Sequence, residues 1–479
     1  MKILLCYHFQ GNFAMAGMEP LGLIQVGRLL RDRGHEVRYS KMNLSLVRNA
    51  IKAFQPRTIG YSICSVHHNH AITLNRRLKE EYGFYSVFGG PHPTFFPEMI
   101  HEDGVDAVCV GEADSSFPDF VDQLEAGGNF KAISNMWVKL APGEVQRNPL
   151  APMVKDLDSL SYPDREGLYQ DHWLKEYPLK TFINSRGCPY SCTYCYNRLH
   201  RELYGKGQPT WRYRSPRHLV GEMEWVKKNW PLAQFTLADD VFVPSTAWLE
   251  EFVEEYRRRV NLPFTCLVRL DRVDDEQARL LAEAGCSLVL AAIESGDEWI
   301  RREVLGRKMT DEQIIAGAGA LHRRGIKLCI ENMMGVPGES LEDALKTLAL
   351  NVRCDADMAI TTLFTPFPNL ELTRRAMAEG IFTGDVSDLP RNMTSRSVLN
   401  LPDKAEIERL QKLLPMLVDL PWARWGVRFL VKLPLHPLYA ILKNAWVSVK
   451  AYRMLKFRPS LRAHAEIAWR GLRYILQDR

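Results

Sequence analysis

The first third of the chain alternates short apolar runs with longer amphipathic stretches. Short apolar runs bounded by glycine, proline or polar residues predict buried strands, and apolar residues spaced three or four apart predict helices. Residues 21–33 have the helical spacing, and Gly34 supplies a stop signal. The predicted strands are residues 2–7, 36–39, 58–64, 85–88 and 107–110.

Strands separated by helices predict a parallel sheet with helices on both faces. We therefore expect an α/β domain over residues 1–140. A stretch rich in proline, aspartate and serine follows, and we place a linker at residues 141–175. Because ligands of parallel sheets bind at the carboxyl ends of the strands, the loops there are candidates for a binding site.

The alternation of strands and helices returns after the linker. Capping residues such as Ser215, Thr310 and Ser340 mark the starts of helices. Six strand–helix units predict an open, partial (β/α)6 barrel over residues 176–385, with its chemistry on the loops that follow the strands. The predicted strands are residues 181–184, 235–238, 264–268, 288–293, 327–332 and 359–364.

Residues 386–479 predict a helical region interrupted by prolines. From Pro421 to the end there are twelve Lys or Arg and two Asp or Glu, a charge of +10 in a chain of net +5. Basic helices with Trp and Leu on one face are typical of proteins that bind an anionic membrane surface. The alternative is a helical cap on the barrel with a solvated basic face. Interleaved aromatic and basic residues also suit nucleic acid, which we do not expect as a partner.

The composition is that of a globular protein of two or three domains, since 46% of the 479 residues are hydrophobic and 25% are charged. The first residues predict a strand rather than a signal peptide, and no apolar run is long enough to span a bilayer. We expect a cytoplasmic protein.

Seven of the ten cysteines are scattered singly, mostly in apolar runs, and predict buried thiols rather than disulfides. The other three, Cys188, Cys192 and Cys195, have the spacing C-x3-C-x2-C. Three close thiolates can hold a four-iron cluster and leave one iron without a protein ligand. Such an iron is free to bind and reduce a small molecule. The alternative is structural zinc, but a second C-x2-C pair is missing from the sequence.

The surroundings of the triad carry a family resemblance. A strand-like run precedes it, Gly187 opens the loop, and the aromatic Tyr194 stands before the third cysteine. This pattern resembles the radical S-adenosylmethionine (SAM) enzymes. In that family three cysteines bind a [4Fe-4S] cluster, SAM chelates the open iron, and one electron cleaves SAM to a 5′-deoxyadenosyl radical. The resemblance implies that the triad is the catalytic metal site. It also implies an external electron donor such as flavodoxin or ferredoxin.

Polar residues follow several predicted barrel strands, although each one taken alone is as readily a structural hydrogen-bonder. Residues 238–242, 293–296 and 334–340 resemble other motifs of the family. The resemblance implies that Glu294 and Ser295 lie near the ribose and amino-acid parts of SAM. It places Tyr194 and the backbone at Gly335 beside the adenine. The polar residues in question are Asp239, Asp240, Arg269, Asp271, Glu294, Ser295 and Glu339.

The loops of the first domain carry a second resemblance. Ser62 follows one predicted strand, and the pair Gly89 and Gly90 follows another. Paired glycines let the backbone approach a large flat ligand, and the absence of G-x-G-x-x-G argues against a dinucleotide. These loops resemble the cobalamin-binding, Rossmann-like domain of many radical SAM enzymes. The resemblance implies that Ser62, Gly89 and Gly90 contact cobalamin.

One mark of some cobalamin domains, an Asp-x-His-x-x-Gly loop that supplies a cobalt ligand, is missing from the sequence. Residues 8–17 occupy the corresponding place and contain His8 but not this pattern. His67, His68 and His70 either face the cofactor or form a polar loop at the sheet edge. A sheet that has lost cobalamin and only shapes the site is a further alternative.

Together these features resemble the cobalamin-dependent, class B-like radical SAM methyltransferases. We expect methylation of an unactivated carbon in a substrate that is hydrophobic or lipid-linked. The alternatives are a radical SAM oxidative cyclase or rearrangement enzyme, with cobalamin in another role or absent, and a sensor without catalytic activity. A methylthiotransferase is disfavoured because Cys6, Cys64 and Cys109 lie far apart in the sequence.

Overall fold

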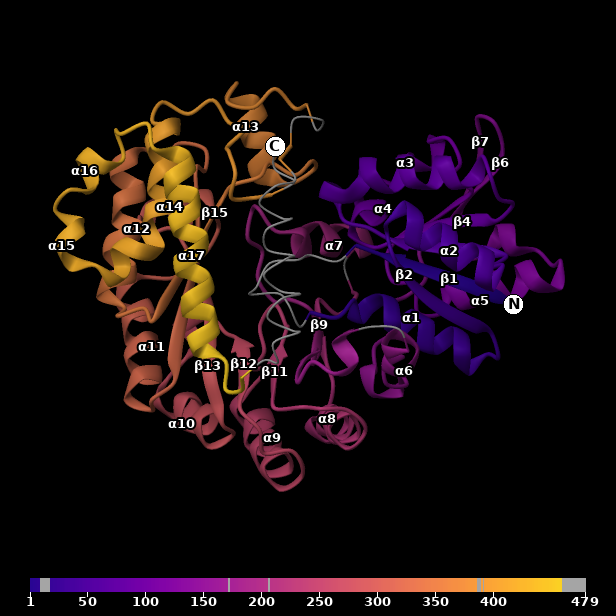
Figure 1. The fold of residues 1–479 in the computed structure, drawn as a ribbon, viewed down its shortest axis with the longest axis horizontal. Coiled ribbons are helices and arrows are strands. Elements are labelled where there is room, and N and C mark those ends of the chain that lie inside the picture. Colours follow the sequence, from indigo (N-terminus) through magenta and orange to yellow (C-terminus); the bar gives the residue numbers. More distant parts are fainter. Residues whose placement is uncertain (9–17, 171–172, 206, 386–388, 391, 459–479) are drawn as a thin grey trace. The chain divides into compact units, whose positions relative to one another are not determined.

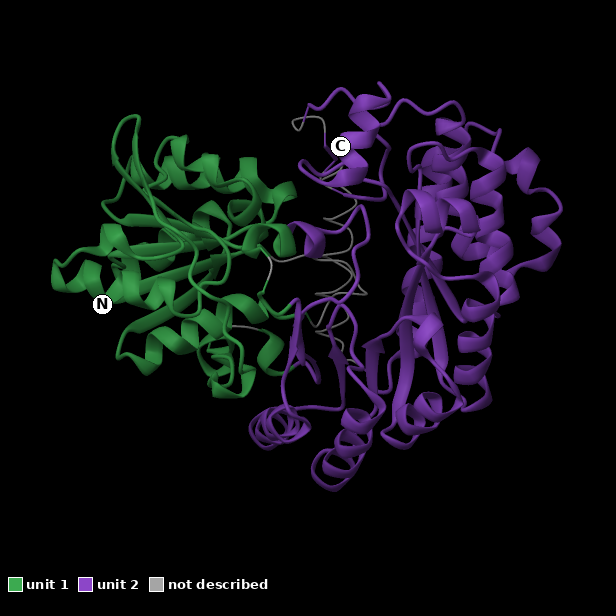
Figure 2. Cartoon of the chain, turned by 180° about the vertical axis from the view of Figure 1, so that it is seen from behind, with its two compact units in different colours: residues 1–10, 18–176, 200–209 green, residues 11–17, 177–199, 210–479 purple. Residues whose placement is uncertain are grey.

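The computed structural model describes residues 1–8, 18–170, 173–205, 207–385, 389–390 and 392–458. The chain divides into two compact units, coloured separately in Figure 2. The first contains residues 1–10, 18–176 and 200–209, and the second contains residues 11–17, 177–199 and 210–479. Each unit is built around its own parallel sheet, so the expected α/β class is confirmed.

The sheet of the first unit has the strand order β2-β1-β3-β4-β5-β6-β7. Neighbours from β2 to β5 are parallel, and β6 and β7 add an antiparallel hairpin that the sequence analysis does not predict. The strands are β1 (Lys2–Tyr7), β2 (Glu36–Lys41), β3 (Thr58–Ser62), β4 (Tyr85–Gly89), β5 (Ala107–Cys109), β6 (Met136–Ala141) and β7 (Glu144–Arg147).

Helices cover both faces of this sheet (Figure 1). The chain leaves β1 in one direction to reach β2 and returns in the other to reach β3, so right-handed crossovers place the first two helices on opposite faces. The first helix packs with α5, and the second packs with α3. The helices are α1 (Leu21–Asp32), α2 (Leu44–Phe54), α3 (His68–Lys79), α4 (Pro91–Phe95), α5 (Ser116–Ala126) and α6 (Arg165–Tyr169).

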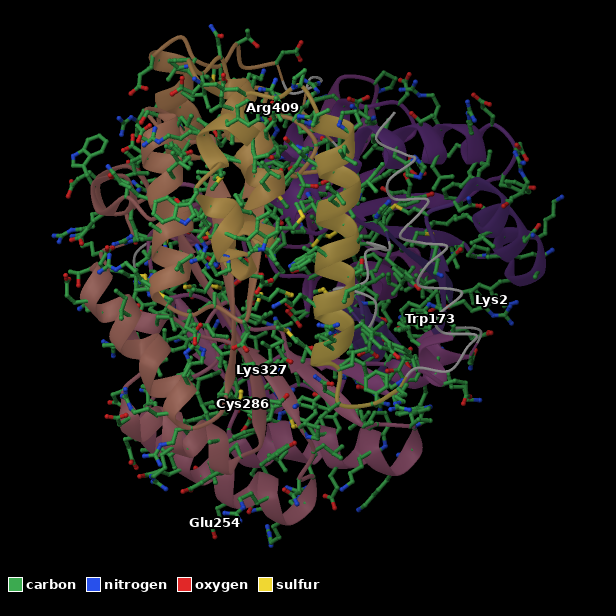
Figure 3. All side chains as sticks on the ribbon, turned by 60° about the vertical axis from the view of Figure 1, so that its left-hand side comes forward. Lys2, Trp173, Glu254, Cys286, Lys327 and Arg409 are labelled. Carbon is green, nitrogen blue, oxygen red and sulfur yellow. The ribbon has the colours of Figure 1, made fainter. Side chains whose placement is uncertain are left out.

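The second unit contains the expected open six-stranded parallel sheet, in the order β15-β14-β13-β12-β11-β8. Cys286 and Lys327 mark the amino ends of its two longest strands, β13 and β14 (Figure 3). The strands are β8 (Leu179–Phe182), β11 (Gln234–Leu237), β12 (Phe264–Leu267), β13 (Cys286–Glu294), β14 (Lys327–Met334) and β15 (Met358–Leu363).

The helices between these strands pack their apolar faces onto the sheet in one large buried core. They are α8 (Pro216–Asn229), α9 (Thr246–Arg259), α10 (Asp275–Glu283), α11 (Asp311–Arg323) and α12 (Leu341–Arg353). Ser215, Thr310 and Ser340 accept hydrogen bonds from the first turns of α8, α11 and α12, as the capping pattern predicts. Outside the sheet lie α7 (Tyr196–Tyr204), an antiparallel pair of β9 (Ser185–Gly187) with β10 (Trp211–Tyr213), and the 3-10 helix η7 (Leu270–Arg272).

The carboxy-terminal region is helical and joins the same core. Helix α14 (Lys404–Asp419) packs against β15 and α12, and α17 (His436–Met454) packs on α14. Trp446 of α17 packs against the core and donates from Nε1 to Asp419 Oδ2 over 2.7 Å. Trp446 therefore has a structural role, whereas Trp469 lies outside the described residues. The remaining helices are α13 (Glu371–Ala378), α15 (Pro421–Arg424) and α16 (Val427–Leu430).

Two features bear on the expectations for cysteines and membranes. All ten cysteines lie within the described residues and are free thiols, and six of the seven scattered ones are buried. Among the described helices, we find none with both the length and the apolar character that crossing a bilayer requires.

Two glycines of α11 provide a test of the packing between this helix and η7. A Cβ at Gly317 would lie 2.1 Å from the carbonyl oxygen of Leu270, whereas at Gly319 it would meet only the end of the Arg323 side chain at 3.3 Å. We expect Gly317→Ala to lower the free energy of unfolding by about 1–3 kcal/mol. Gly319→Ala should raise it by about 0.5–1 kcal/mol through helix propensity. Urea denaturation measures both, and equal effects would contradict this packing.

Candidate functional site

The cysteine triad lies on the loop that follows β8 and β9 and precedes α7. At the start of this loop Gly187 has φ +82°, and a Cβ there would lie 2.3 Å from the carbonyl oxygen of Thr210. Only glycine fits this turn without displacing the backbone of β10. Further along, the amide of Cys195 donates to the carbonyl of Cys192 over 3.2 Å, which curls the loop so that it leads into α7.

Neighbouring cysteines oppose the ionisation of Cys188 and Cys195. Burial, with smaller contributions from Asp240, Cys192 and Cys188, raises the pKa of Cys195 to about 11. Burial also raises the pKa of Cys188, and Asp240 and Cys192 act in the same direction. A thiolate becomes favourable here when a bound cation compensates its charge, which is what iron does in a cluster. Three cysteines at this spacing on one loop are the donor set that a [4Fe-4S] cluster with one open iron requires.

Asp239 and Asp240, which follow β11, accept hydrogen bonds from the protein itself rather than facing an open site. Asp239, fully buried after β11, accepts from the amide of Asn184 over 3.0 Å. It also accepts from the amide and hydroxyl of Ser185, both over 2.5 Å. Burial raises the pKa of Asp239 to about 7. Asp240 accepts from Asn197 Nδ2 over 2.8 Å, which fixes the start of α7.

Arg269 and Asp271, which follow β12, form a pair that contacts the cysteine loop. Arg269 places its guanidinium 3.7 Å from the centre of the Tyr190 ring, within the cysteine loop. The same guanidinium donates to both carboxylate oxygens of Asp271 over 3.0 Å. A cation stacked on an aromatic face and fixed by a bidentate carboxylate is a rigid contact. Arg269 and Asp271 thus position the loop.

Tyr194 and Glu294 are brought together, and the sequence analysis missed the residue that joins them. The Tyr194 hydroxyl donates to Glu294 Oε1 over 2.8 Å and accepts from Arg307 Nη1 over 3.1 Å. Arg307 Nη1 also lies 4.0 Å from Glu294 Oε1 and 4.0 Å from Cys192 Sγ. Burial raises the pKa of Glu294, although Arg307 acts to lower it. The Arg307 guanidinium therefore contacts both the cysteine loop, at Tyr194 and Cys192, and the end of β13, at Glu294.

A further carboxyl shares this environment. Glu331 on β14 has its pKa raised to about 7 by burial and by the neighbouring Glu294. Ionisation of both Glu294 and Glu331 beside the single guanidinium of Arg307 is unfavourable, because both carboxyls are buried. The site can therefore hold a proton on this pair near neutral pH. In the sequence Glu331 and Asn332 interrupt the apolar residues of this strand, and that interruption is the available signal.

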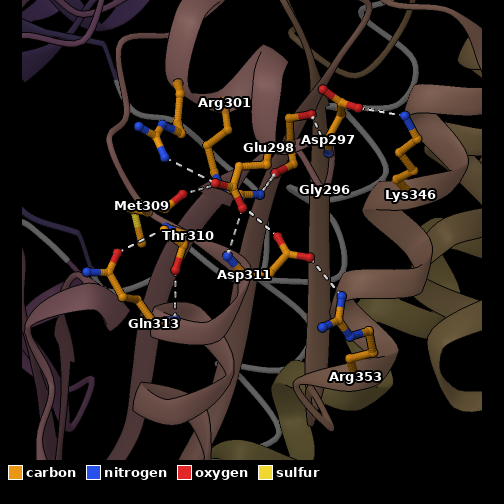
Figure 4. A network of polar contacts seen from close by, with 12 residues as sticks. Gly296, Asp297, Glu298, Arg301, Met309, Thr310, Asp311, Gln313, Lys346 and Arg353 are labelled. Carbon is orange, nitrogen blue, oxygen red and sulfur yellow. Dashed lines mark hydrogen bonds and ion pairs between the residues drawn. The ribbon is translucent and has the colours of Figure 1, made fainter.

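Ser295 is buried inside its own turn. Its hydroxyl accepts from the amide of Asp297 over 3.2 Å, and its carbonyl accepts from Arg301 Nη1 over 2.8 Å. Arg301 is fully buried and also donates to the carbonyl of Met309 and to Asp311 Oδ1, over 2.9 and 2.7 Å (Figure 4). This network holds the turn after β13 and with it Glu294, which has φ +66°. The sequence analysis did not single out Arg301.

The Gly335 segment is closed by Glu339. The amides of Gly335 and Val336 both donate to Glu339 Oε2, the second over 3.3 Å. Glu339 is 2% exposed, and burial raises its pKa to about 8, so it is largely protonated at pH 7. Gly335 has φ +71°, which favours glycine. Its amide is thus already engaged, which leaves its carbonyl as the backbone group for a ligand.

In the first unit, the three predicted cobalamin contacts lie side by side at the carboxyl edge of the sheet. Ser62 ends β3, Gly89 ends β4, and the two are paired in register. Gly90 has φ +98°, and a Cβ there would lie 2.8 Å from the carbonyl oxygen of Ile63 and 3.3 Å from Ser62 Oγ. At Gly89 a Cβ would meet only Cys109, at 3.8 Å. The backbone at Gly89 is therefore open to a ligand, as a flat macrocycle requires.

Histidines gather at the same edge. The rings of His8 and His67 stack with centroids 3.4 Å apart, and those of His68 and His92 stack at 4.3 Å. Desolvation lowers the pKa of His92 to about 3 and that of His8 to about 4, so both are neutral at pH 7. His68 Nε2 is buried and lacks a hydrogen-bond partner among the described residues. Stacked imidazole rings, two of them neutral, and a buried ring nitrogen without a partner among the described residues fit a large, partly apolar cofactor such as cobalamin.

Two further expectations concern His70 and the loop of residues 8–17. Nε2 of His70 lies 2.9 Å from the carbonyl oxygen of Met42, so this histidine is held by the backbone. The loop of residues 8–17 lies outside the described residues after His8. Gly111 provides an additional close contact, because a Cβ there would lie 2.3 Å from the Tyr204 hydroxyl. That hydroxyl accepts from the amide of Glu112 over 2.8 Å.

Comparison with known proteins agrees with both halves of this picture. Residues 183–350 match the model of the radical SAM superfamily, and residues 16–121 match that of the B12 binding domain. An uncharacterised methyltransferase of Pyrococcus horikoshii is 26% identical over 76% of this chain and 79% of that protein. Cytidylyl-2-hydroxyethylphosphonate methyltransferase of Streptomyces wedmorensis is 22% identical over 82% of this chain and 84% of that protein.

The fold also matches a solved structure, that of the cobalamin-dependent SAM radical enzyme OxsB with aqua-cobalamin and SAM bound. The TM-score is 0.71 at 17% identity, over 99% of this chain and 75% of that chain. The two matched domains confirm the three expected cofactors, a [4Fe-4S] cluster, SAM and cobalamin, and the expectation of an enzyme. Residues 183–350 therefore form a radical SAM domain, and a B12-binding domain precedes it in the chain, at residues 16–121.

Proposed function

We propose that this protein is a cobalamin-dependent radical SAM methyltransferase that methylates an unactivated carbon. The observation that carries the proposal is the loop of Cys188, Cys192 and Cys195, three free thiols on one short loop, in a chain that also has a B12-binding domain. The methyltransferase names of the relatives from Pyrococcus and Streptomyces support methyl transfer. When bound, the cluster supplies the electron that cleaves SAM, and cobalamin carries the methyl group.

The residues around the cluster have positioning roles in this proposal. Arg307 keeps the Tyr194 hydroxyl and the Glu294 carboxyl together beside Cys192. Its Nε is buried without a partner among the described residues, so the guanidinium has a donor left for a polar group of SAM. Glu294 and the turn at Ser295 would then lie at the ribose and amino-acid parts of SAM. The Gly335 carbonyl and Tyr194 would lie beside the adenine.

In the first unit, we assign Ser62, Gly89 and Gly90 as contacts of cobalamin, at the edge where the sheet backbone is open. The stacked histidines complete this edge, and His8 and His92 are neutral there at pH 7. We further propose a hydrophobic or lipid-linked substrate, a peripheral position on a membrane, and flavodoxin or ferredoxin as the external electron donor. The basic, aromatic composition after Pro421 supports the membrane position.

Turnover with SAM labelled in its methyl group tests the reaction type. After anaerobic reconstitution with iron, sulfide and cobalamin, we expect 5′-deoxyadenosine and S-adenosylhomocysteine to form together. Methyl transfer consumes one SAM for the radical and another for the methyl group, so both products are required. Deoxyadenosine without S-adenosylhomocysteine would reject methyl transfer in favour of cyclisation or rearrangement.

Removal of any one cluster thiol should abolish SAM cleavage. We expect Cys188→Ala, Cys192→Ala and Cys195→Ala each to lose the cluster's visible absorption and its iron, because one iron of the cube then lacks its thiolate. Cobalamin binding, read from its own absorption, should be retained. Cys354→Ala is the matched control, since Cys354 is a buried thiol at the end of α12 and should keep the cluster. Full cleavage by any triad variant would show that the ligand assignment is wrong.

The Gly335 segment should make stability depend on pH. The pKa of Glu339 is raised by burial from 4.5 to about 8, so its contribution is complete below about pH 4.5 and is lost as pH rises through about 8. We expect the free energy of unfolding of the apoprotein to fall over this range by up to about 1.4 kcal/mol per pH unit from this group.

Glu339→Gln should flatten that decline, because the amide oxygen still accepts hydrogen bonds but does not ionise. Part of the decline should remain, since the pKa values of Asp239 and Glu331 are also raised to about 7. Urea denaturation across the pH range measures the effect. Glu312→Gln, at an exposed position of α11, serves as the control and should keep the wild-type slope. An unchanged slope in Glu339→Gln would contradict the buried, protonated carboxyl.

A further inference from the structure

Three large aromatic side chains stand out from the second unit between residues 421 and 432. Trp422 is 74% exposed, Trp425 is 95% exposed and Phe429 is 67% exposed. Trp422 lies on α15, Trp425 directly follows that helix and Phe429 lies on α16, so the three are only three and four residues apart in the chain. Leaving so much aromatic surface in water is costly, and a cluster of this kind marks a surface that binds something.

The backbone that carries these side chains is fixed to the rest of the second unit by buried side chains and hydrogen bonds. Val427 and Val431 are buried in the core of the second unit. Arg424 donates to the carbonyls of Leu417 and Val418, over 2.8 and 2.5 Å. Arg409 donates to the carbonyl of Val431 over 2.7 Å. Because the backbone is fixed, the aromatic side chains are held at the surface in a defined arrangement.

The charge around the aromatics has one sign. Residues 421–458 contain eight Lys or Arg and lack Asp and Glu altogether. Two of the cations, Arg428 and Lys432, are exposed on the same stretch as the aromatics. Arg428 pairs with Glu342, but the two side chains are 65% and 58% exposed, so solvent screens the pair. The surface therefore combines Trp and Phe with positive charge.

We propose that Trp422, Trp425 and Phe429, with Arg428 and Lys432, form a surface that binds an anionic lipid bilayer. Trp favours the headgroup level of a bilayer, and Lys and Arg beside it are attracted to anionic headgroups. A second copy of the chain fits less well, because a self-complementary contact would bring two basic faces together. The inference rests on the membrane position in the proposed function and gives that position its residues. Binding through this surface would bring the enzyme to a lipid-linked substrate.

Vesicle flotation of the full-length, cofactor-loaded protein tests this surface. We expect flotation with vesicles of phosphatidylcholine and phosphatidylglycerol, and about tenfold less with phosphatidylcholine alone. Trp422→Ala, Trp425→Ala and Phe429→Ala combined should reduce flotation with the mixed vesicles by about tenfold or more. Trp299→Ala is the matched control, since Trp299 is 58% exposed and stands outside the surface, and it should float like the wild type.

A second pair of variants separates charge from packing. Arg428→Gln with Lys432→Gln should weaken binding to the mixed vesicles by about tenfold, and added salt should mimic this loss. Lys228→Gln with Lys308→Gln keeps the net charge of that variant and should bind normally. Equal flotation by the wild type and the aromatic triple variant would overturn the proposal. Concentration-dependent dimerisation that is abolished only in the aromatic triple variant would also overturn it, because the surface would then bind a second copy of the chain.

Flotation needs no turnover, so this test and the labelled-SAM test fail independently. Loss of flotation with methyl transfer intact would locate the defect in the surface. Normal flotation without methyl transfer would reject the reaction and leave the surface standing. Circular dichroism of each variant checks folding, and the aromatic side chains are exposed enough that their removal should not alter the core.

Discussion

The buried carboxyl of Asp239 is the contact on which the geometry of the radical SAM domain depends. It stands at the end of β11 and accepts hydrogen bonds from two consecutive amides, those of Asn184 and Ser185, just beyond the neighbouring β8. Without it those amides would be buried without partners at the point where the chain leaves the sheet. The turn that it fixes leads through β9 into the cysteine loop. One side chain therefore ties the sheet, the most rigid part of the unit, to the metal-binding segment.

The elements that follow from local pattern were predictable. Apolar runs such as 2–7 and 288–293 form strands because burial and backbone pairing are both satisfied by a short extended apolar segment. The hairpin of β6 and β7 was missed although Pro142 and Gly143 stand between its two short runs, which is itself a hairpin signal. The sequence analysis places the beginning of a linker at residue 141, within this hairpin. Its outer strand is mostly exposed, so the apolar signal there is weak.

The site was predictable only as far as its motifs are local. The three cysteines and Tyr194 lie within eight residues, so their spacing alone indicates shared chemistry. Arg307 acts through Tyr194 and Glu294, and its distance of 113 residues from Tyr194 in the chain hides the contact. Asp239, Asp240 and Asp271 look alike in sequence. Only their partners show that each secures a backbone or a side chain rather than facing a ligand.

The raised pKa values of the cluster thiols have a consequence for how the enzyme matures. Before iron arrives, Cys188 and Cys195 are held as neutral thiols by burial, and a neutral thiol is a poor nucleophile. These two thiols are thus less reactive towards alkylating agents in the apoprotein than an ordinary exposed thiol. Protons must leave as iron is bound, so assembly of the cluster is coupled to proton release and favoured at higher pH. The surroundings that raise the pKa values of Cys188 and Cys195 therefore make cluster insertion a pH-dependent step.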